Sequence, residues 1–407
     1  MFEKNFVDVI KYDLISKLPD PFLFNDGRRV ESTEDWEERR KELYEKVVDL
    51  QFGGMPPEPE FLEVEPLCFG EAYQYRIKTG TRKNPIILDF VLFKTKDSEK
   101  APVVISGDLC FKRMYDKNMI STITDNGINL LLFNRTELCP DISSYNLVGL
   151  RTEETGEYKL GKEIWDSLQD GNCGGQIRKT YPEGTYSAVS AWAWGYKRCV
   201  DALEILGNVD TDFVIFTGHS RGAKTAALAG IVDERAKIVN PNATCCGGNS
   251  GYRIAIETKM EDGTIEKSEP LENIIKLFPA WMGLGMREYV GREGDLPFDS
   301  HEFKAMIAPR ILFVSEATHD TWANPVGSWQ TSVAAGEVYK FLGCEENMYW
   351  YFRPGKHNQT PEDLGQLVNI INHVKKGDAI NDKFYVRPFK EFPPAYDWTA
   401  PENKSLK

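Results

Sequence analysis

The feature that most constrains the fold is a junction in the middle of the chain, at Val214–Gly230 (VIFTGHSRGAKTAALAG). An apolar, β-branched run leads into the letters TGHSRG, and a run of small, helix-forming residues follows at once. A strand that turns sharply into a helix with G-x-S-x-G at the corner is the signature of a nucleophile elbow. Gly218 and Gly222 lack a Cβ, so neighbouring chain passes close to Ser220. We therefore expect Ser220 to be a nucleophile; the alternative is a glycine-rich turn without chemistry.

Composition excludes several classes of protein. The chain has 407 residues, of which 41% are hydrophobic and 27% charged, enough for a large globular core. Its net charge of −13 disfavours binding to nucleic acid or to anionic membranes. The N-terminus has no apolar run behind a basic start, and no stretch is long enough to span a membrane. We therefore expect a cytoplasmic protein, although a secreted chain whose leader had been removed would look the same.

The cysteines and histidines give no sign of a metal centre. The eight cysteines are dispersed without a C-x-x-C pair, and the five histidines lack metal-ligand spacing. We therefore expect free thiols, no metal and no cofactor.

Apolar strand patterns alternate with helical patterns along most of the chain. We expect an N-terminal arm and helix over 1–60 that pack on the core, one catalytic domain over 61–390 and a tail over 391–407. A polar, Gly/Asp-rich stretch at about 134–186 reads as an insertion over one face. Alternating strands and helices predict a mostly parallel central sheet flanked by helices, a three-layer sandwich. Together with the elbow, this pattern predicts the α/β-hydrolase fold. The expected strands are 61–67, 71–78, 85–94, 102–105, 128–133, 213–216, 236–239, 310–315 and 348–352; the expected helices are 36–50, 187–206, 223–229, 332–341 and 361–373.

A serine hydroxyl needs a general base, and in this fold the base follows the acid in the chain. His357 directly follows a predicted strand (MYWYF) and a short turn, where the base belongs. His219 is adjacent to the serine, so we expect it to pack and form hydrogen bonds under the elbow. His301 lies at a helix entry and His373 in the last helix, and both are read as structural.

The acid should follow the preceding strand, RILFVS. Asp320 is the candidate there. Glu316 is its competitor but stands close to the strand end, and His319 is a less suitable neighbour. On the helix after the serine, Arg221 is expected to supply an oxyanion-stabilising backbone N–H, and its side chain either adds a charged donor or pairs with a surface acid.

Lys224 lies one helical turn from Ser220, so both side chains face the same side. It either binds a substrate oxygen or belongs to a solvated helix face.

At this point the chain resembles the glucuronoyl esterases of carbohydrate esterase family 15, in their bacterial branch. The resemblance rests on the ordered segments GHSRGAK, LPFDSHEFKAMIAPR, SEATHDTWANPVGSWQ and RPGKHNQTPED. It implies a serine esterase without a metal, which cleaves esters between (4-O-methyl-)glucuronic acid on xylan and lignin alcohols. It further implies that Arg221 stabilises the oxyanion and that the substrate is bound by Lys224, Trp322 and, less securely, Glu269.

Two departures from the fungal pattern stand out. The segment that holds the fungal acid corresponds to 241–248 (PNATCCGG), which has no carboxylate, and this favours Asp320. The fungal members also join a cysteine just before the serine to one just after the histidine in a disulfide. These positions are His219 and Asn358 here, so the resemblance implies that this disulfide is missing.

The sequence therefore predicts a serine esterase with Ser220, His357 and Asp320 as its triad, acting on a small-molecule or oligosaccharide uronate ester. The alternatives are an acetyl esterase of xylo-oligosaccharides with the same triad, and a non-catalytic carbohydrate-binding relative.

Overall fold

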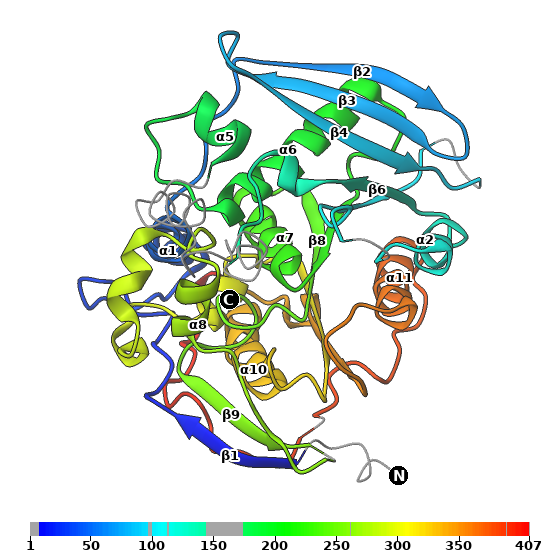
Figure 1. The fold of residues 1–407 in the computed structure, drawn as a ribbon. Coiled ribbons are helices and arrows are strands. Elements are labelled where there is room, and N and C mark those ends of the chain that lie inside the picture. The colour runs from blue at the N-terminus through cyan, green and yellow to red at the C-terminus, as the bar shows by residue number, and fades with distance from the viewer. Residues whose placement is uncertain are drawn as a thin grey trace.

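The computed structural model of the chain describes residues 8–96, 100–111, 114–143, 174–260, 262–387 and 389–406. Within these residues, a nine-stranded sheet forms the centre of the molecule, and helices cover both of its faces (Figure 1). Neighbouring strands are parallel from β12 to β6 and antiparallel from β6 to β2, which confirms the predicted α/β-hydrolase fold. Across the sheet the order is β12 (Met348–Arg353), β11 (Ile311–Ala317), β8 (Ala236–Asn242), β7 (Val214–His219), β5 (Val103–Ser106), β6 (Asn129–Phe133), β4 (Pro85–Phe93), β3 (Tyr73–Gly80) and β2 (Phe61–Phe69).

The helices fall into long elements that pack on the sheet and short turns in the loops. The α-helices are α1 (Thr33–Tyr44), α2 (Lys117–Thr124), α5 (Gly175–Thr180), α6 (Ala188–Leu206), α7 (Arg221–Val232), α8 (Leu271–Leu277), α9 (Ser300–Ala305), α10 (Pro325–Phe341) and α11 (Pro361–Lys376). A π-helical segment, η2 (Glu45–Leu50), continues α1, and 3-10 turns form η3 (Arg135–Glu137), η5 (Leu284–Tyr289), η6 (Glu293–Asp295), η7 (Glu345–Asn347) and η8 (Lys404–Leu406). Among the residues that the structure describes, no helix is both long and apolar enough to cross a membrane.

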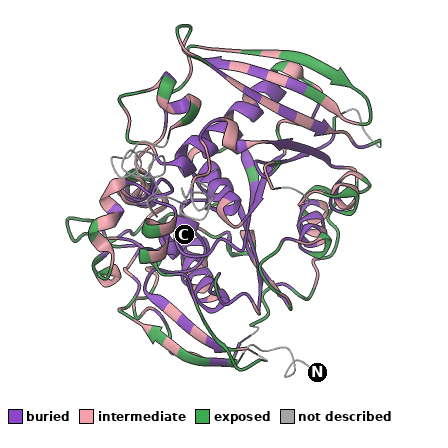
Figure 2. Ribbon diagram, in the orientation of Figure 1, coloured by how far each residue is buried: buried purple, intermediate pink, exposed green. Residues whose placement is uncertain are grey.

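Alternate residues of the parallel strands point to opposite faces of the sheet, and both faces are buried. Val104 and Ile215 belong to the apolar cluster beneath α2 and α11, whereas Ile105 and Phe216 join the larger cluster beneath α6 and α7. Strands buried on both sides read as continuous apolar runs, which is why the sequence located them. In Figure 2 the middle of the sheet is almost wholly buried, while β2 and β1 are largely exposed.

Polar contacts connect the end of β12 to the start of α11, and these contacts fix the loop between them. The Thr360 side chain accepts from the Asp363 backbone, and the Asp363 carboxylate accepts from the Thr360 backbone in a capping box. The Arg353 Nε donates to both Asp363 oxygens at 3.0 and 2.9 Å, and its Nη2 donates to Asn358 Oδ1 at 3.0 Å. His357 therefore lies on a short, doubly anchored loop.

The N-terminal segment, expected as an arm, contains a strand that was not predicted from the sequence. Residues 8–14 form β1 (Asp8–Leu14), which pairs antiparallel with β9 (Ile254–Lys259), and β10 (Ile265–Lys267) completes a second, three-stranded sheet. Its outer strands carry charged and exposed residues and lack a clear apolar run. In addition, α10 begins at Pro325, seven residues before the predicted start, because Asn324 caps it by accepting from the Gly327 N–H at 2.9 Å.

The predicted domain limits stay predictions. The described residues near these limits form helices or pack against the body of the molecule. Of the expected insertion, residues 144–173 lie outside the described residues, and the flanks contain η3 and α5. The C-terminal tail packs against the body of the molecule. Its Asn403 Nδ2 donates to the Phe341 carbonyl at 2.9 Å, and its Lys404 N–H donates to the Glu31 carbonyl at 2.8 Å.

Candidate active site

Ser220 lies at the sharp turn between β7 and α7, at the carboxyl edge of the sheet. Its backbone has φ 57° and ψ −121°, a conformation that L-residues rarely adopt and that costs on the order of 1–3 kcal/mol. The turn is possible because of its two glycines. A Cβ on Gly218 would lie 2.4 Å from the Gly222 carbonyl oxygen, and one on Gly222 would lie 1.9 Å from Asp108 Oδ1. The predicted nucleophile elbow is therefore present.

The loops after β11 and β12 bring an acid and a base to this serine. The His357 Nε2 lies 2.9 Å from Ser220 Oγ, and its Nδ1 lies 2.6 Å from Asp320 Oδ2. With Nδ1 protonated and donating to the carboxylate, Nε2 is free to accept the serine proton. The other carboxylate oxygen, Asp320 Oδ1, accepts from the Ala323 N–H at 3.2 Å, which fixes the orientation of the acid. The three residues chosen from the sequence thus form one hydrogen-bonded chain.

Glu316, the competing acid, does not reach this chain. It is fully buried on β11, and its Oε1 accepts from Asn249 Nδ2 at 3.0 Å and from Ser328 Oγ at 2.9 Å. Burial raises the pKa of Glu316 to about 8, so the side chain is largely uncharged at neutral pH. An uncharged acid that is engaged elsewhere is unsuited to orient the His357 imidazole.

The other histidines stay outside the triad, as expected. His219 is buried beneath the elbow, where its Nδ1 lies 2.7 Å from Asn242 Oδ1 and its ring centroid lies 4.7 Å from that of His357. Burial and the nearby His357 lower the pKa of His219 to about 3, so its imidazole stays neutral. His301 Nε2 lies 2.8 Å from the Pro19 carbonyl, and His373 Nδ1 lies 2.6 Å from that of Asp378.

Arg221 pairs with an acid, but not with one on an open surface. The Nη1 of Arg221 donates to both oxygens of Asp141 at 3.2 and 3.1 Å, and the exposed fraction of the Asp141 side chain is only 13%. The guanidinium also lies over the rings of Trp281, at 4.4 Å from the centroid, and Phe278, at 4.9 Å. These contacts hold the charge next to Ser220, where the first N–H groups of α7 also point.

Lys224 is buried, which contradicts the solvated-face reading. Its ammonium group donates to the Thr244 carbonyl and lies 3.9 Å from Glu269 Oε2 and 5.7 Å from the Trp281 ring centroid. Burial raises the pKa of Glu269, and the Lys224 charge partly offsets this. Among the described residues, Glu269 Oε2 is a buried acceptor with no hydrogen-bond donor.

Trp322 lies beside this pair. Its carbonyl accepts from the Glu269 N–H at 3.0 Å, and 38% of its surface is exposed. The structure thus brings all seven predicted residues to one region.

A cleft of about 530 Å³ opens on the other side of the triad, next to His357. Its apolar lining comes from the loop after β5, from α2 and from Pro361, and Ser220, His357 and Arg221 line its inner end. The apolar lining was not predicted from the sequence, and neither were the roles of Asp141 and Trp281. Only tertiary packing brings the lining residues together: Phe111, Met114, Asp116, Met119, His219, Ser220, Arg221, His357, Asn358, Gln359, Thr360 and Pro361.

The described residues contain no group of three or more His, Cys, Asp or Glu side chains placed to hold a metal ion. Cys68, Cys110, Cys199, Cys245, Cys246 and Cys344 are free thiols, and Cys173 lies outside the described residues.

A serine at a strained strand–helix turn, bonded to a histidine that is oriented by an aspartate, on this sheet topology, defines a serine hydrolase of the α/β-hydrolase class. Comparisons with known proteins narrow the class. The family model "Glucuronyl esterase, fungi" matches residues 163–343. The 4-O-methyl-glucuronoyl methylesterase of Schizophyllum commune is 27% identical over 379 residues, covering 91% of this chain and 85% of that protein. A homologous methylesterase of Wolfiporia cocos is 26% identical, covering 84% and 76%.

Solved structures agree. A carbohydrate esterase family 15 glucuronoyl esterase from Caldicellulosiruptor kristjansonii superposes with a TM-score of 0.78 at 25% identity, covering 95% of this chain and 98% of that one. The glucuronoyl esterase catalytic domain from Hypocrea jecorina shares the fold, with a TM-score of 0.72 at 22% identity, covering 97% and 99%. Over most of its length, the chain is therefore similar to glucuronoyl esterases of carbohydrate esterase family 15.

Proposed function

We propose that this chain hydrolyses esters of glucuronic acid or 4-O-methylglucuronic acid, with Ser220 as the nucleophile. The observation that carries the proposal is the buried Lys224–Glu269 pair beside the triad. Burying two charges costs free energy, and a role in binding the substrate explains why the pair is there. A fixed ammonium donor, and a carboxylate whose Oε2 has no donor among the described residues, suit the hydroxyl groups of a sugar. The exposed ring of Trp322 offers a face on which a pyranose can stack.

In the acylation step, His357 Nε2 takes the Ser220 proton as Oγ attacks the ester carbonyl. The negative charge that develops on the carbonyl oxygen is stabilised by the N–H groups at the start of α7 and by the Arg221 guanidinium. Asp320 keeps the imidazole in the correct tautomer and stabilises it when it is protonated. His357 then returns the proton to the leaving alcohol oxygen, and a glucuronoyl–serine ester remains. Water, activated by His357, releases the uronate by the same steps in reverse order.

The position of His357 indicates on which side of the triad the leaving alcohol lies and on which side the sugar lies. The general acid must lie within hydrogen-bond reach of the leaving oxygen, so the alcohol leaves on the His357 side. The cleft there is lined by Phe111, Met114, Met119 and Pro361, side chains that favour an apolar or aromatic alcohol. The sugar then occupies the side of Lys224, Glu269 and Trp322.

The experiment compares benzyl glucuronate with an acetylated xylose, a substrate of the alternative acetyl esterase. Lys224→Met removes the ammonium group but keeps most of the apolar stem. We expect it to lower kcat/KM for benzyl glucuronate about 100-fold, since the loss of one charged hydrogen bond is worth about 1.5–3 kcal/mol. For the acetyl ester, which the wild type should hydrolyse more slowly, Lys224→Met should change kcat/KM less than about threefold. Equal losses on both esters, or a wild type that prefers the acetyl ester, would contradict the uronate proposal.

A further inference from the structure

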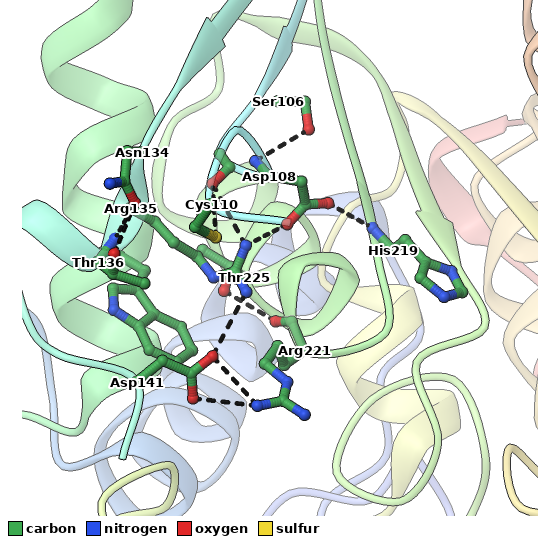
Figure 3. Close-up of polar contacts among 12 residues, drawn as sticks. Ser106, Asp108, Cys110, Asn134, Arg135, Thr136, Asp141, His219, Arg221 and Thr225 are labelled. Atoms are coloured by element: carbon green, nitrogen blue, oxygen red, sulfur yellow. Dashed lines mark hydrogen bonds and ion pairs between the residues drawn. The ribbon is translucent and has the colours of Figure 1, made fainter. Parts of the chain in front are cut away.

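An unbroken series of alternating charges runs from the nucleophile elbow to Arg221 (Figure 3). It begins with Asp108 in the loop after β5, continues through Arg135 in η3 and Asp141 in the loop beyond, and ends at Arg221. The series joins the loop after β5, the η3 turn with the loop that follows it, and the start of α7. Only Arg221 was singled out from the sequence, so the other three need an explanation.

Asp108 lies directly beneath the elbow and is fully buried. Its Oδ2 accepts from the His219 N–H at 2.7 Å, and its Oδ1 accepts from Arg135 Nη1. Burial raises the pKa of Asp108, and the Arg135 charge opposes this shift. The close approach of this carboxylate to Gly222 ties the Asp108 position to the backbone on both sides of Ser220.

Arg135 is also fully buried, and its guanidinium lies 4.5 Å from the ring centroid of Phe111 and 4.9 Å from that of Trp192. Its Nη2 lies 3.6 Å from Asp141 Oδ2. A buried guanidinium is tolerated only when carboxylates compensate it, and here it has one on each side. Arg135 therefore connects a carboxylate fixed to the elbow with a carboxylate that contacts Arg221.

Among the described residues, Asp141 meets three side chains. It accepts from Arg221 Nη1 and from Trp281 Nε1, the latter at 3.2 Å to Oδ1, and it forms an ion pair with Arg135 without a hydrogen bond. Trp281 is also the ring over which Arg221 lies, so the carboxylate and the ring together fix the plane of the guanidinium. Among the described residues, Asp141 accepts from Nη1 of the guanidinium, and the buried Arg221 Nε has no acceptor. Donors on this guanidinium thus stay available to a negative charge at Ser220.

We propose that Asp141 is a positioning residue, which holds the Arg221 guanidinium in the orientation that stabilises the oxyanion, and that Arg135 and Asp108 fix Asp141 relative to the elbow. The proposal rests on the role given to Arg221 under the proposed function. An oriented donor is effective because it need not reorganise as charge develops. Such an interaction forms in the transition state, so its loss lowers kcat and leaves KM nearly unchanged.

The test is a double-mutant cycle with Asp141→Asn and Arg221→Met. Asparagine keeps the shape and one acceptor oxygen but removes the charge. We expect Asp141→Asn to lower kcat for benzyl glucuronate about 30-fold, somewhat less than the loss of a whole oxyanion donor, with KM changed less than about threefold. In the Arg221→Met background, the same substitution should change kcat less than about twofold, because its effect acts through Arg221. The control is Asp89→Asn, which breaks the Arg76–Asp89 pair on the sheet surface and should leave kcat unchanged.

A merely structural ion pair would give a different result. Equal losses from Asp141→Asn in both backgrounds, or no loss in the wild-type background, would overturn the proposal. The cycle is repeated on the rate at which a fluorophosphonate labels Ser220, a reaction that also places negative charge on the oxyanion donors. If labelling shows the coupling but no uronate ester is hydrolysed, the proposed substrate is wrong and the positioning role stands. If the two substitutions have independent effects on the labelling rate while uronate turnover by the wild type is normal, the positioning role is refuted and the proposed substrate stands.

Discussion

At the scale of single residues, two buried histidines set the acid limit of the fold. Burial lowers the pKa of both His219 and His301 to about 3, whereas an unfolded histidine has a pKa of about 6.5. Between these values the unfolded chain binds a proton that the native chain excludes. The free energy of unfolding is therefore undiminished above pH 6.5 and falls as the pH is lowered below it.

His301 allows this effect to be measured away from the triad. At pH 5 the buried, neutral His301 lowers the free energy of unfolding by about 2 kcal/mol, because pH 5 lies about 1.5 units below the pKa of the unfolded histidine. In urea titrations, the loss of unfolding free energy between pH 7 and pH 5 should be about 2 kcal/mol smaller in His301→Gln than in the wild type. His373→Gln, on the half-exposed end of α11, serves as the control and should lose as much as the wild type. An unchanged loss in His301→Gln would show that this imidazole takes up a proton in the native state.

The choice between the two acids is also a single-residue question. Asp320→Asn keeps the shape of the side chain but favours the wrong imidazole tautomer, so kcat should fall on the order of 10⁴-fold. Glu316→Gln, four residues earlier, should change kcat less than tenfold, because Glu316 has no contact with His357. Steady-state rates on benzyl glucuronate distinguish them. A loss of less than tenfold in Asp320→Asn would move the acid to another residue.

At the scale of elements, the elbow requires glycine at 222 because a fixed carboxylate occupies the space of a Cβ. Asp108 cannot withdraw, since the His219 N–H and Arg135 hold both of its oxygens. Gly222→Ala should therefore lower the free energy of unfolding by about 3 kcal/mol. Gly365→Ala is the matched control, because a Cβ there meets no heavy atom within 4 Å, and it should gain up to about 0.8 kcal/mol in α11. A Gly222→Ala protein as stable as the wild type in urea would mean that Asp108 is not fixed beneath the elbow.

Elements that are buried on both faces were predictable from the sequence, and edge elements were not. The strand at Asn129–Phe133 and the helix at Ala188–Leu206 were located within one or two residues, because burial forces continuous apolar runs or apolar stripes. The strand Asp8–Leu14 was missed, because it gains its partner only from residues about 240 positions away and is mostly exposed. Local pattern contains no information about such pairing.

At the scale of the whole molecule, the same distinction separates the parts of the site. The order Ser220, Asp320, His357 follows from the topology, because the loops after β7, β11 and β12 open at one edge of the sheet. Arg135 lies in η3 and Asp141 in the loop that follows it, in a stretch beyond β6 whose polar residues are typical of a solvated surface. Their role depends on burial and on contacts with Trp281 and the elbow, which only the folded molecule reveals.

The proposed function depends on one reaction at one serine. The most direct measurement is the release of benzyl alcohol from benzyl glucuronate by the wild type and by Ser220→Ala, a substitution that removes only the nucleophilic oxygen. We predict saturable turnover by the wild type and a loss of at least about 1,000-fold in the variant. A variant that retains wild-type activity would contradict the proposed nucleophile. A wild type that turns over neither this ester nor any activated ester would favour a non-catalytic carbohydrate-binding relative.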